Sequence, residues 1–315
     1  MKEEIKNMRI AVVGLGGVGG YMAGMLTRVF DQVTFCARGE RARSLKEHGL
    51  LLHSDFNGES LTHPLRVVES ADQIGEADII LVCVKNYSLE EVGHLLGPVV
   101  KEDTIILPVM NGVDPGDTLR ACLEKGIVVD SLIYIVAFAN EDYSITQQGK
   151  FADVIFGIMD ADEKEEMAVN KVASLMEAAG ITYKVSDDVE AETWKKYIFN
   201  CAYNVLTAAY DNNVGQLKAD PKKVQEIHDL IHEAYLVAVK KGVHVNDADE
   251  KALLHRFLYE VADDGTSSLQ RDIQAGKMAE TETFGGYIVK EAEKLGIATP
   301  VSERMYRRLL ELSGK

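Results

Sequence analysis

One lysine and two asparagines recur at intervals of four in an otherwise apolar stretch, WKKYIFNCAYNVLTAAY at residues 194–210. On a helix, side chains four residues apart lie on one face, so Lys196, Asn200 and Asn204 form a polar stripe. Two interpretations are open, the solvent face of an amphipathic helix or the lining of a polar cleft. A solvent face usually carries glutamate, lysine and arginine, and asparagine is a poor helix former, so we favour the cleft.

A second group of polar residues lies in TSSLQRDIQAGKMAETE, residues 266–282. If this stretch is helical, Ser268, Asp272, Gly276 and Glu280 also recur every four residues. The alternative is that Ser267, Ser268 and Asp272 only begin a helix and satisfy its free N–H groups.

Near the N-terminus, the β-branched run RIAVVG at residues 9–14 leads through GLGGVGG, residues 14–20, into the apolar periodic stretch YMAGMLTRVF. This strand, glycine turn and helix are the context that a dinucleotide-binding G-x-G-x-x-G motif requires. Gly14 permits the tight turn, Gly16 lets a pyrophosphate approach the backbone, and Gly19 lets the helix pack on the strand. The free N–H groups at the start of the helix then face the phosphates.

The cofactor type is indicated by QVTFCAR, a second strand that ends at Arg38. An acidic residue near this position suits the ribose hydroxyl of NAD, whereas an arginine suits the 2′-phosphate of NADP. Arg41 and Arg43 follow, and Glu40 lies among them. We therefore expect NADP as the cofactor. The alternative is that these arginines are only the solvated, basic start of a helix.

Two further apolar runs, at residues 77–88 and 104–114, are typical of buried parallel strands. Ligands of open α/β sheets bind beyond the carboxyl ends of such strands, where Lys85 and Asn111 lie. Each also has an ordinary explanation, a surface lysine and an Asn-Gly turn. Residues 127–158 suggest additional, antiparallel strands, and ITYKVS at 181–186 a last strand.

Composition limits the partners. The chain has 315 residues and a formal net charge of -16, which argues against nucleic acid or an anionic membrane as the main partner. Its four cysteines are far apart and form no CxxC pair, as expected of reduced thiols in a cytoplasmic protein. No segment approaches the length of an apolar membrane span, and no metal site is expected.

Long helical periodicity begins at Asp187, so we expect a boundary near residue 185. Residues 1–185 would form a Rossmann-type domain and residues 186–315 an all-helical substrate domain, with the cleft between them as the default active site. A homodimer is left open, because the helical half shows no coiled-coil heptad.

In this order and spacing, GLGGVGG, VCVKNYS, VMNGVD, WKKYIFNCAYNVLTA and SSLQRDIQAGKMAETE resemble the ketopantoate reductases (2-dehydropantoate 2-reductases). The resemblance implies a Rossmann domain followed by a helical domain like that of 6-phosphogluconate dehydrogenases. It also implies reduction of ketopantoate to pantoate with NADPH, on the pathway to pantothenate. Lys196 would be the catalytic lysine and Glu280 its acidic partner. The resemblance implies that the substrate is contacted by Asn200, Asn204, Ser268 and Asn111. It implies that the cofactor is contacted by Asn111, by Lys85, which also faces the substrate, and by Arg38, which binds the 2′-phosphate.

The implied chemistry accounts for the stripe. Hydride transfer to C2 of a 2-oxo acid builds negative charge on the carbonyl oxygen, which an ammonium group can stabilise and protonate. Glu280 would favour the charged form of Lys196, and the asparagines would hold substrate oxygens without adding charge.

Two departures from the family pattern put the substrate in doubt. Val205 stands where the family commonly has proline, and Val214 stands where it commonly has an asparagine before Gly-Glu-Leu. Asn213 is one residue early, so that contact is not carried over. The alternatives are an NADP-dependent reductase of another 2-oxo or 3-oxo acid, and a non-catalytic NADP-binding sensor for which Lys196 and Glu280 would be dispensable.

Overall fold

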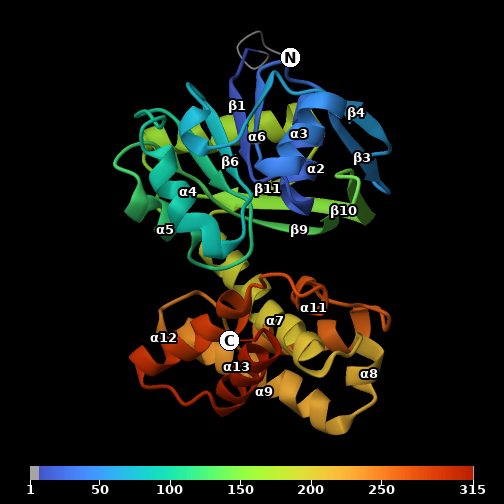
Figure 1. Cartoon of the computed structure of the whole chain (residues 1–315). Coiled ribbons are helices and arrows are strands. Elements are labelled where there is room, and N and C mark those ends of the chain that lie inside the picture. Colours follow the sequence, from blue (N-terminus) through green and yellow to red (C-terminus); the bar gives the residue numbers. More distant parts are fainter. Residues whose placement is uncertain (1–6, 315) are drawn as a thin grey trace. The chain divides into compact units, whose positions relative to one another are not determined.

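The structure, a computed structural model, describes residues 7–314. Its internal contacts divide the chain into two compact units, Met1–Val189 and Glu190–Lys315 (Figure 1). The first is built on β-sheets and the second from helices. The predicted fold class, a Rossmann-type α/β domain followed by a helical domain, is therefore confirmed.

The first unit contains a six-stranded sheet in which every neighbouring pair is parallel. In spatial order its strands are β5 (Arg66–Val68), β2 (Val33–Cys36), β1 (Ile10–Val13), β6 (Ile79–Val82), β7 (Ile105–Pro108) and β8 (Ile127–Val128). The chain adds strands on one side of β1 and then on the other, beginning with β6. Such a reversal is the switch point at which open α/β sheets bind ligands.

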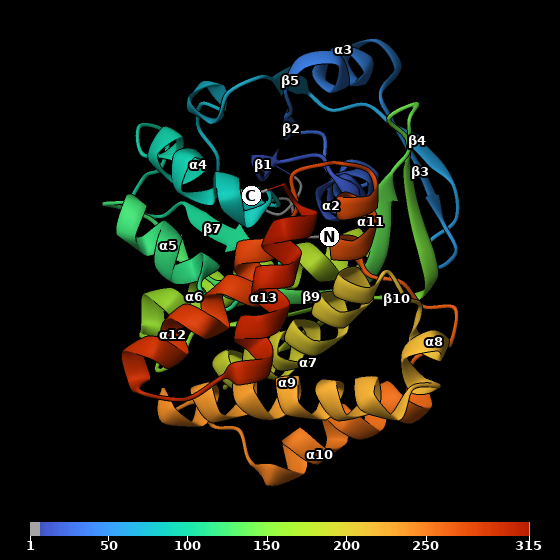
Figure 2. The same cartoon turned by 60° about the horizontal axis from the view of Figure 1, so that its bottom comes forward.

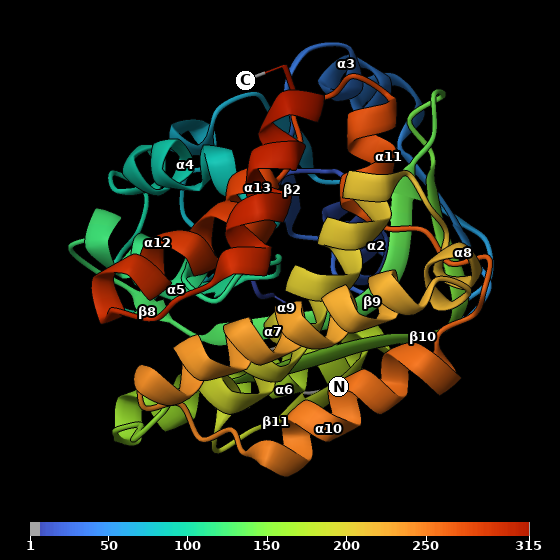
Figure 3. The same cartoon turned by 90° about the horizontal axis from the view of Figure 1, so that it is seen from below.

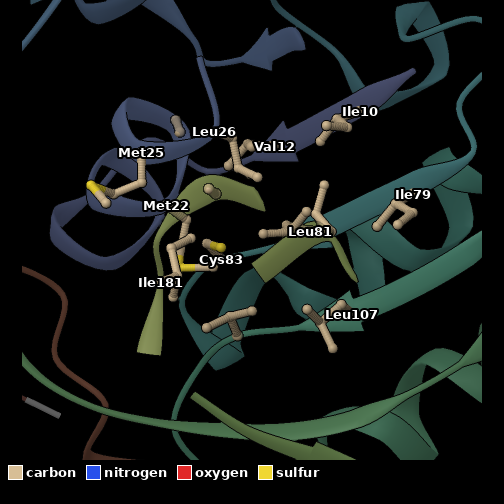
Figure 4. Packing of buried hydrophobic residues seen from close by; sticks show 14 of the residues in the cluster. Ile10, Val12, Met22, Met25, Leu26, Ile79, Leu81, Cys83, Leu107 and Ile181 are labelled. Carbon is tan, nitrogen blue, oxygen red and sulfur yellow. The ribbon is translucent and has the colours of Figure 1, made fainter. Parts of the chain in front are cut away.

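Every residue of the four central strands β2, β1, β6 and β7 is buried, so both faces of the sheet are covered there, which explains why these strands are mostly apolar. Along β1, Ile10 and Val12 belong to one core cluster, and Ala11 and Val13 belong to the other. Figure 4 shows Ile10 and Val12 near side chains of α2 (Gly17–Thr27), among them Leu26. The glycine turn that joins β1 to α2 is thus held by packing on both of its flanks.

A second sheet contains β11 (Thr182–Val185), β10 (Ile145–Gly157), β3 (Leu50–Ser54) and β4 (Ser60–Thr62), in that order, with β9 (Asp130–Ala139) paired to β10. The β9–β10 pair is antiparallel, as predicted for residues 127–158. Residues 127 and 128 do not belong to this antiparallel pair, because they form β8 in the first sheet. Helix α2 contacts β1 as well as β9 and β10, so it lies between the two sheets.

Four further helices cover this unit, namely α3 (Gly39–His48), α4 (Leu89–Leu96), α5 (Pro115–Cys122) and α6 (Glu163–Ala179). Figure 2 shows α4 and α5 side by side, in agreement with their contacts. Helix α6 begins with a capping box, in which the Asp162 side chain accepts from the Glu165 backbone N–H.

The second unit begins with α7 (Val189–Tyr210), the longest helix among the described residues. It continues through α8 (Val214–Lys218), α9 (Pro221–Lys240), α10 (Asp247–His255), α11 (Ser268–Gln274), α12 (Tyr287–Leu295) and α13 (Pro300–Leu312). Two π-helices, η3 (Arg256–Glu260) and η4 (Glu282–Gly286), interrupt the series. Helices α9 and α10 pack side by side (Figure 3).

Candidate active site

The glycine turn has the backbone geometry of a phosphate-binding loop. Gly14 has φ = +88°, and a Cβ there would lie 2.8 Å from the Cys83 carbonyl oxygen. A Cβ on Gly19 would overlap the Gly14 carbonyl oxygen, so both glycines are required by the packing of the turn itself. Gly16 differs, because no atom of the described chain lies within 4 Å of the position of its Cβ. The open space over Gly16 fits close approach by a ligand.

Lys85 and Asn111 follow the carboxyl ends of the adjacent parallel strands β6 and β7, where the sequence predicted them. Both are partly buried. The Asn86 side chain donates a hydrogen bond to the Asn111 carbonyl oxygen over 2.7 Å, which joins the two loops. Gly112, with φ = +110°, then turns the chain away.

The cations after β2 differ in their surroundings. Arg38 is exposed and forms an ion pair with Glu91 at 2.9 Å, and Arg43 forms one with Glu40 at 3.0 Å. Arg41 is partly buried, and its Nε and one Nη have no hydrogen-bond partner among residues 7–314. Burial also lowers the pKa of this guanidinium. Of the three arginines, Arg41 therefore has unused donors.

The Arg41 guanidinium lies near an aromatic ring from another part of the chain. Its carbon is 5.9 Å from the ring centroid of Tyr143, at the turn between β9 and β10. This approach could not be predicted, because the two residues are about a hundred positions apart and share no motif.

In the second unit, Lys196, Asn200 and Asn204 lie on the unbroken helix α7. Asn204 is only 5% exposed, and the other two are partly buried. Trp194, Ile198, Phe199, Val205 and Leu206, which flank the stripe, are all buried. The interpretation of this stripe as a solvent face is therefore wrong.

Aromatic packing fixes the orientation of α7. The Trp194 and Tyr197 rings meet edge to face at 5.7 Å, and Tyr197 meets Tyr287 of α12 in the same way at 5.8 Å. The Tyr197 hydroxyl also donates to the Thr283 carbonyl oxygen in η4. These contacts restrict rotation of the helix, so the polar stripe has a fixed direction.

The segment 266–282 does not continue as one helix, which corrects the four-residue pattern proposed for it. Helix α11 ends at Gln274, because Gly276 adopts φ = +63° and the chain leaves the helix there. Glu280 lies beyond the break and is 4% exposed. It is therefore a buried carboxylate just before η4, and not a member of the helix face that begins at Ser268.

The start of α11 nevertheless meets the stripe of α7. Ser267 is the cap, since its side chain accepts from the Gln270 backbone N–H, and the Thr207 hydroxyl donates to it over 2.7 Å. Ser268 Oγ lies 3.5 Å from Asn204 Oδ1. The alternative that Ser267 caps the helix is thus correct for that residue, while Ser268 faces α7.

Lys196 has a strongly perturbed acidity. Its pKa is lowered to about 8, chiefly because the ammonium group is buried; the Glu280 carboxylate acts in the opposite direction and Arg256 lowers the value further. Glu280 thus has the effect on Lys196 that the sequence predicted, but burial outweighs it. Arg256 was not singled out from the sequence, because it lies in an irregular segment without a motif.

Asn213 and Gln216 have a structural role. They form a capping box at the start of α8, with the Asn213 side chain accepting from the Gln216 backbone N–H.

Within residues 7–314, no helix is long and apolar enough to cross a membrane. The same residues contain no group of three or more histidine, cysteine, aspartate or glutamate side chains placed to hold a metal ion.

Two family models match the chain. "Ketopantoate reductase PanE/ApbA" matches residues 10–161, and its C-terminal counterpart, "Ketopantoate reductase PanE/ApbA C terminal", matches residues 188–313. A curated relative, "Uncharacterized oxidoreductase YkpB" of Bacillus subtilis (strain 168), is 30% identical over 96% of this chain and 98% of its own length.

Solved structures agree with this match. A PanE/ApbA family ketopantoate reductase from Ralstonia eutropha JMP134 is 26% identical, with a TM-score of 0.88 over 98% of this chain and 99% of that chain. D-mandelate dehydrogenase in a ternary structure with NADH and anilino(oxo)acetate has a TM-score of 0.87 at 21% identity, over 98% of both chains, which shows a shared fold.

The glycine turn at the switch point shows a Rossmann-type domain, and the family models and the relative named an oxidoreductase place the chain among oxidoreductases built on such a domain. With both family models matched across most of its length, this chain belongs to the ketopantoate reductase family.

Proposed function

We propose that this protein reduces ketopantoate (2-dehydropantoate) to pantoate with NADPH, on the pathway to pantothenate and coenzyme A. The observation that carries the proposal is the buried Lys196, which lies on α7 with Glu280 in its electrostatic environment. Asn200 and Asn204 follow on the same helix, and Ser268 approaches Asn204. This is a proton donor surrounded by neutral hydrogen-bonding groups. We place the reaction in the cytoplasm.

Lys196 performs the acid step. As C2 of the oxo acid accepts a hydride, negative charge builds on the carbonyl oxygen, and the Lys196 ammonium stabilises this charge and transfers a proton to it. With a pKa of about 8, Lys196 is mostly protonated at pH 7 yet close enough to the working pH to give up its proton. Asn200, Asn204 and Ser268 hold the substrate oxygens.

The first unit fits a nicotinamide dinucleotide. Its open space over Gly16 and the N-terminus of α2 would hold the pyrophosphate, and Lys85 and Asn111 lie past the neighbouring strand ends. Bound NADPH supplies the hydride. These residues of the first unit bind and orient the dinucleotide.

The unused donors of Arg41 favour NADPH over NADH. A buried guanidinium nitrogen without a hydrogen-bond partner is costly, and a 2′-phosphate has the charge and oxygens to satisfy it. Arg38 directly precedes α3, without a side-chain capping bond, and lies three residues before Arg41, so both cations lie at the start of that helix. We assign the 2′-phosphate to this pair.

A second candidate is a related reductase of another 2-oxo acid. The fold is shared with D-mandelate dehydrogenase, whose structure contains an oxo acid analogue and NADH. Val205, where the family commonly has proline, is buried beside Asn204, so the local surface can differ. Lys196 and Glu280 would serve any such carbonyl group.

The proposal is tested by initial rates of NADPH oxidation with purified protein. Ketopantoate is compared with a panel of other 2-oxo and 3-oxo acids, and NADPH with NADH. Fast turnover confined to ketopantoate and NADPH supports the proposal. Turnover of a different oxo acid in its place moves the protein to the second candidate, and NADPH binding without any turnover favours a non-catalytic sensor.

A further inference from the structure

Arg256 brings a second cation to the segment of α7 that carries Lys196. It is the first residue of the π-helix η3, and its guanidinium carbon lies 4.8 Å from the ring centroid of Phe199. Phe199 is three residues after Lys196 and directly before Asn200 on α7. Residues three apart are neighbours on a helix surface, so the guanidinium packs against a neighbour of Lys196 on α7, and its charge acts on the lysine.

The position of the guanidinium is fixed by aromatic stacking. Phe199 is 7% exposed and stacks on Tyr203 with centroids 5.6 Å apart. The Tyr203 hydroxyl donates to the Thr266 carbonyl oxygen over 2.9 Å, which ties the stack to the segment that enters α11. Arg256 is partly buried against this stack, and short π-helices such as η3 are frequent at functional sites.

The charges of these groups leave an excess that suits one anion. Lys196 and Arg256 each carry one positive charge and Glu280 carries one negative charge, so the three groups together have a net charge of about +1. Two cations in one region repel each other. An incoming carboxylate removes this repulsion, whereas a neutral carbonyl compound does not.

A 2-oxo acid has its carboxylate directly bonded to the carbon that is reduced. A group that binds this carboxylate must therefore lie close to the group that protonates the neighbouring carbonyl oxygen. Asn200, Asn204 and Ser268 are neutral, and Lys196 is engaged at the carbonyl. A guanidinium is the side chain best matched to a carboxylate, because it can donate two parallel hydrogen bonds.

We propose that Arg256 binds the carboxylate of the 2-oxo acid and makes the site selective for acids over neutral carbonyl compounds. This inference rests on the proposed reductase function. It assigns the recognition of the substrate's charge to Arg256, a residue that lies outside the family motifs.

A second consequence concerns the pH dependence of the reaction. The charged groups that act on Lys196 are Glu280 and Arg256, and the arginine lowers the pKa of the lysine. Removing the arginine charge therefore raises this pKa. Reduction needs protonated Lys196, so the fall of kcat/KM at alkaline pH moves to a higher pH. A purely structural role of Arg256 predicts no such movement.

The test uses the full-length protein and its variants Arg256→Gln and Arg256→Lys, with ketopantoate and its neutral carboxamide as paired substrates. We expect Arg256→Gln to raise KM for the acid about 10- to 100-fold, as for loss of a hydrogen bond to a charged group. KM for the carboxamide should change little, and the alkaline limb should move upward. Arg256→Lys keeps the positive charge, so it should retain part of the preference for the acid over the carboxamide and leave the alkaline limb of kcat/KM where it is in the wild-type protein. Lys251→Gln removes an exposed cation of α10 and is the control.

The outcomes separate this inference from the proposed function. If wild-type protein reduces the acid, but Arg256→Gln keeps the acid-to-amide ratio, the inference is wrong and the function stands, whether or not the alkaline limb moves. An equal loss for both substrates also contradicts it, because it indicates structural support. If the Gln variant does not fold, Arg256→Lys decides: an acid-to-amide ratio that is reduced but not abolished, with an unmoved alkaline limb, supports the carboxylate contact, and an unchanged ratio contradicts the inference. Absence of wild-type turnover with either substrate defeats the proposed function instead.

Discussion

At the residue scale, the chemistry depends on how burial and neighbouring charges set the acidity of Lys196. Burial alone drives the pKa of a lysine down, and Glu280 keeps the value from falling further. The result is a group that is protonated at neutral pH and still able to release its proton. A lysine in water, with a pKa near 10.4, would hold that proton more tightly.

Replacing Lys196 by alanine should lower kcat by about 10²- to 10⁴-fold, the usual contribution of a positioned acid. NADPH affinity should stay within about twofold, because the residues that we assign to the cofactor belong to the first unit. Stopped-flow turnover and fluorescence titration of NADPH measure the two effects. Lys195→Ala is the matched control, since the neighbouring lysine pairs with Asp249 at 3.0 Å. Equal loss in both variants would contradict the role of Lys196.

Replacing Glu280 by glutamine should move the alkaline limb of kcat/KM to a lower pH. The carboxylate raises the pKa of Lys196, so its loss lowers that pKa, and the protonated form is then lost at a lower pH. A pH profile of NADPH oxidation measures this, with Glu311→Gln as an exposed control. An unmoved limb would show that Glu280 does not act on the proton donor.

The cofactor preference should depend on Arg41 as well as Arg38. Arg41→Gln should weaken NADPH about tenfold or more and leave NADH nearly unchanged, because only NADPH has a phosphate for the unused donors. Arg38→Ala should act in the same direction, because Arg38 would exchange its exposed ion pair with Glu91 for the phosphate, while Arg43→Gln, which removes a cation paired with Glu40 within α3 and not assigned to the phosphate, should not. The ratio of dissociation constants for the two dinucleotides measures the effect. A ratio that neither Arg41→Gln nor Arg38→Ala changes would contradict the assignment to NADP.

At the element scale, the regular parts of the candidate site could be predicted from the sequence and the irregular parts could not. The glycine turn and the stripe on α7 follow from local patterns with periods that the backbone imposes. The break at Gly276, the π-helix that begins at Arg256 and the approach of Tyr143 to Arg41 depend on tertiary packing. The sequence therefore predicted that Glu280 lies on one face of a helix, whereas that helix ends before Glu280.

Helix α13 depends on a buried carboxylate of another helix. Glu233 of α9 is 6% exposed and accepts from the backbone N–H groups of Val301 and Ser302 at 2.9 and 2.7 Å, and from the Ser302 hydroxyl. It thus satisfies free donors in the first turn of α13 and complements the dipole of that helix.

Glu233→Ala should lower the free energy of unfolding by about 1–3 kcal/mol, the cost of leaving buried donors without a partner. Asp229→Asn, a change at a partly exposed position of the same helix, should stay within about 0.5 kcal/mol. Urea denaturation followed by circular dichroism measures both. Equal stability of the two variants would show that the contact with α13 is not needed.

At the scale of the whole molecule, net charge and local charge differ in sign. The chain carries -16, yet the groups that we assign to the cofactor phosphate and to the substrate carboxylate are arginines. An acidic protein can therefore bind two anions through small cationic clusters, while its overall charge disfavours nucleic acid. The sequence left the oligomeric state open, and light scattering by the purified protein would show whether it is a homodimer.

The family is established by the whole chain, whereas the substrate depends on a few side chains. Fold and family follow from matches that cover most of the residues. On our proposal the oxo acid is decided by side chains such as Val205, which departs from the family pattern within a recognised motif, and Arg256, which lies outside the motifs. For this reason the substrate needs a direct chemical test.

The most direct test follows hydride transfer into the product. Wild-type protein is incubated with ketopantoate and NADPH that carries deuterium at the transferable position, and the product is examined by mass spectrometry. We predict pantoate with one deuterium at C2, formed rapidly by wild-type protein and by Lys195→Ala, and almost absent with Lys196→Ala. Unlabelled or absent pantoate from wild-type protein, or equal labelling by Lys196→Ala, would contradict a ketopantoate reductase in which Lys196 is the proton donor.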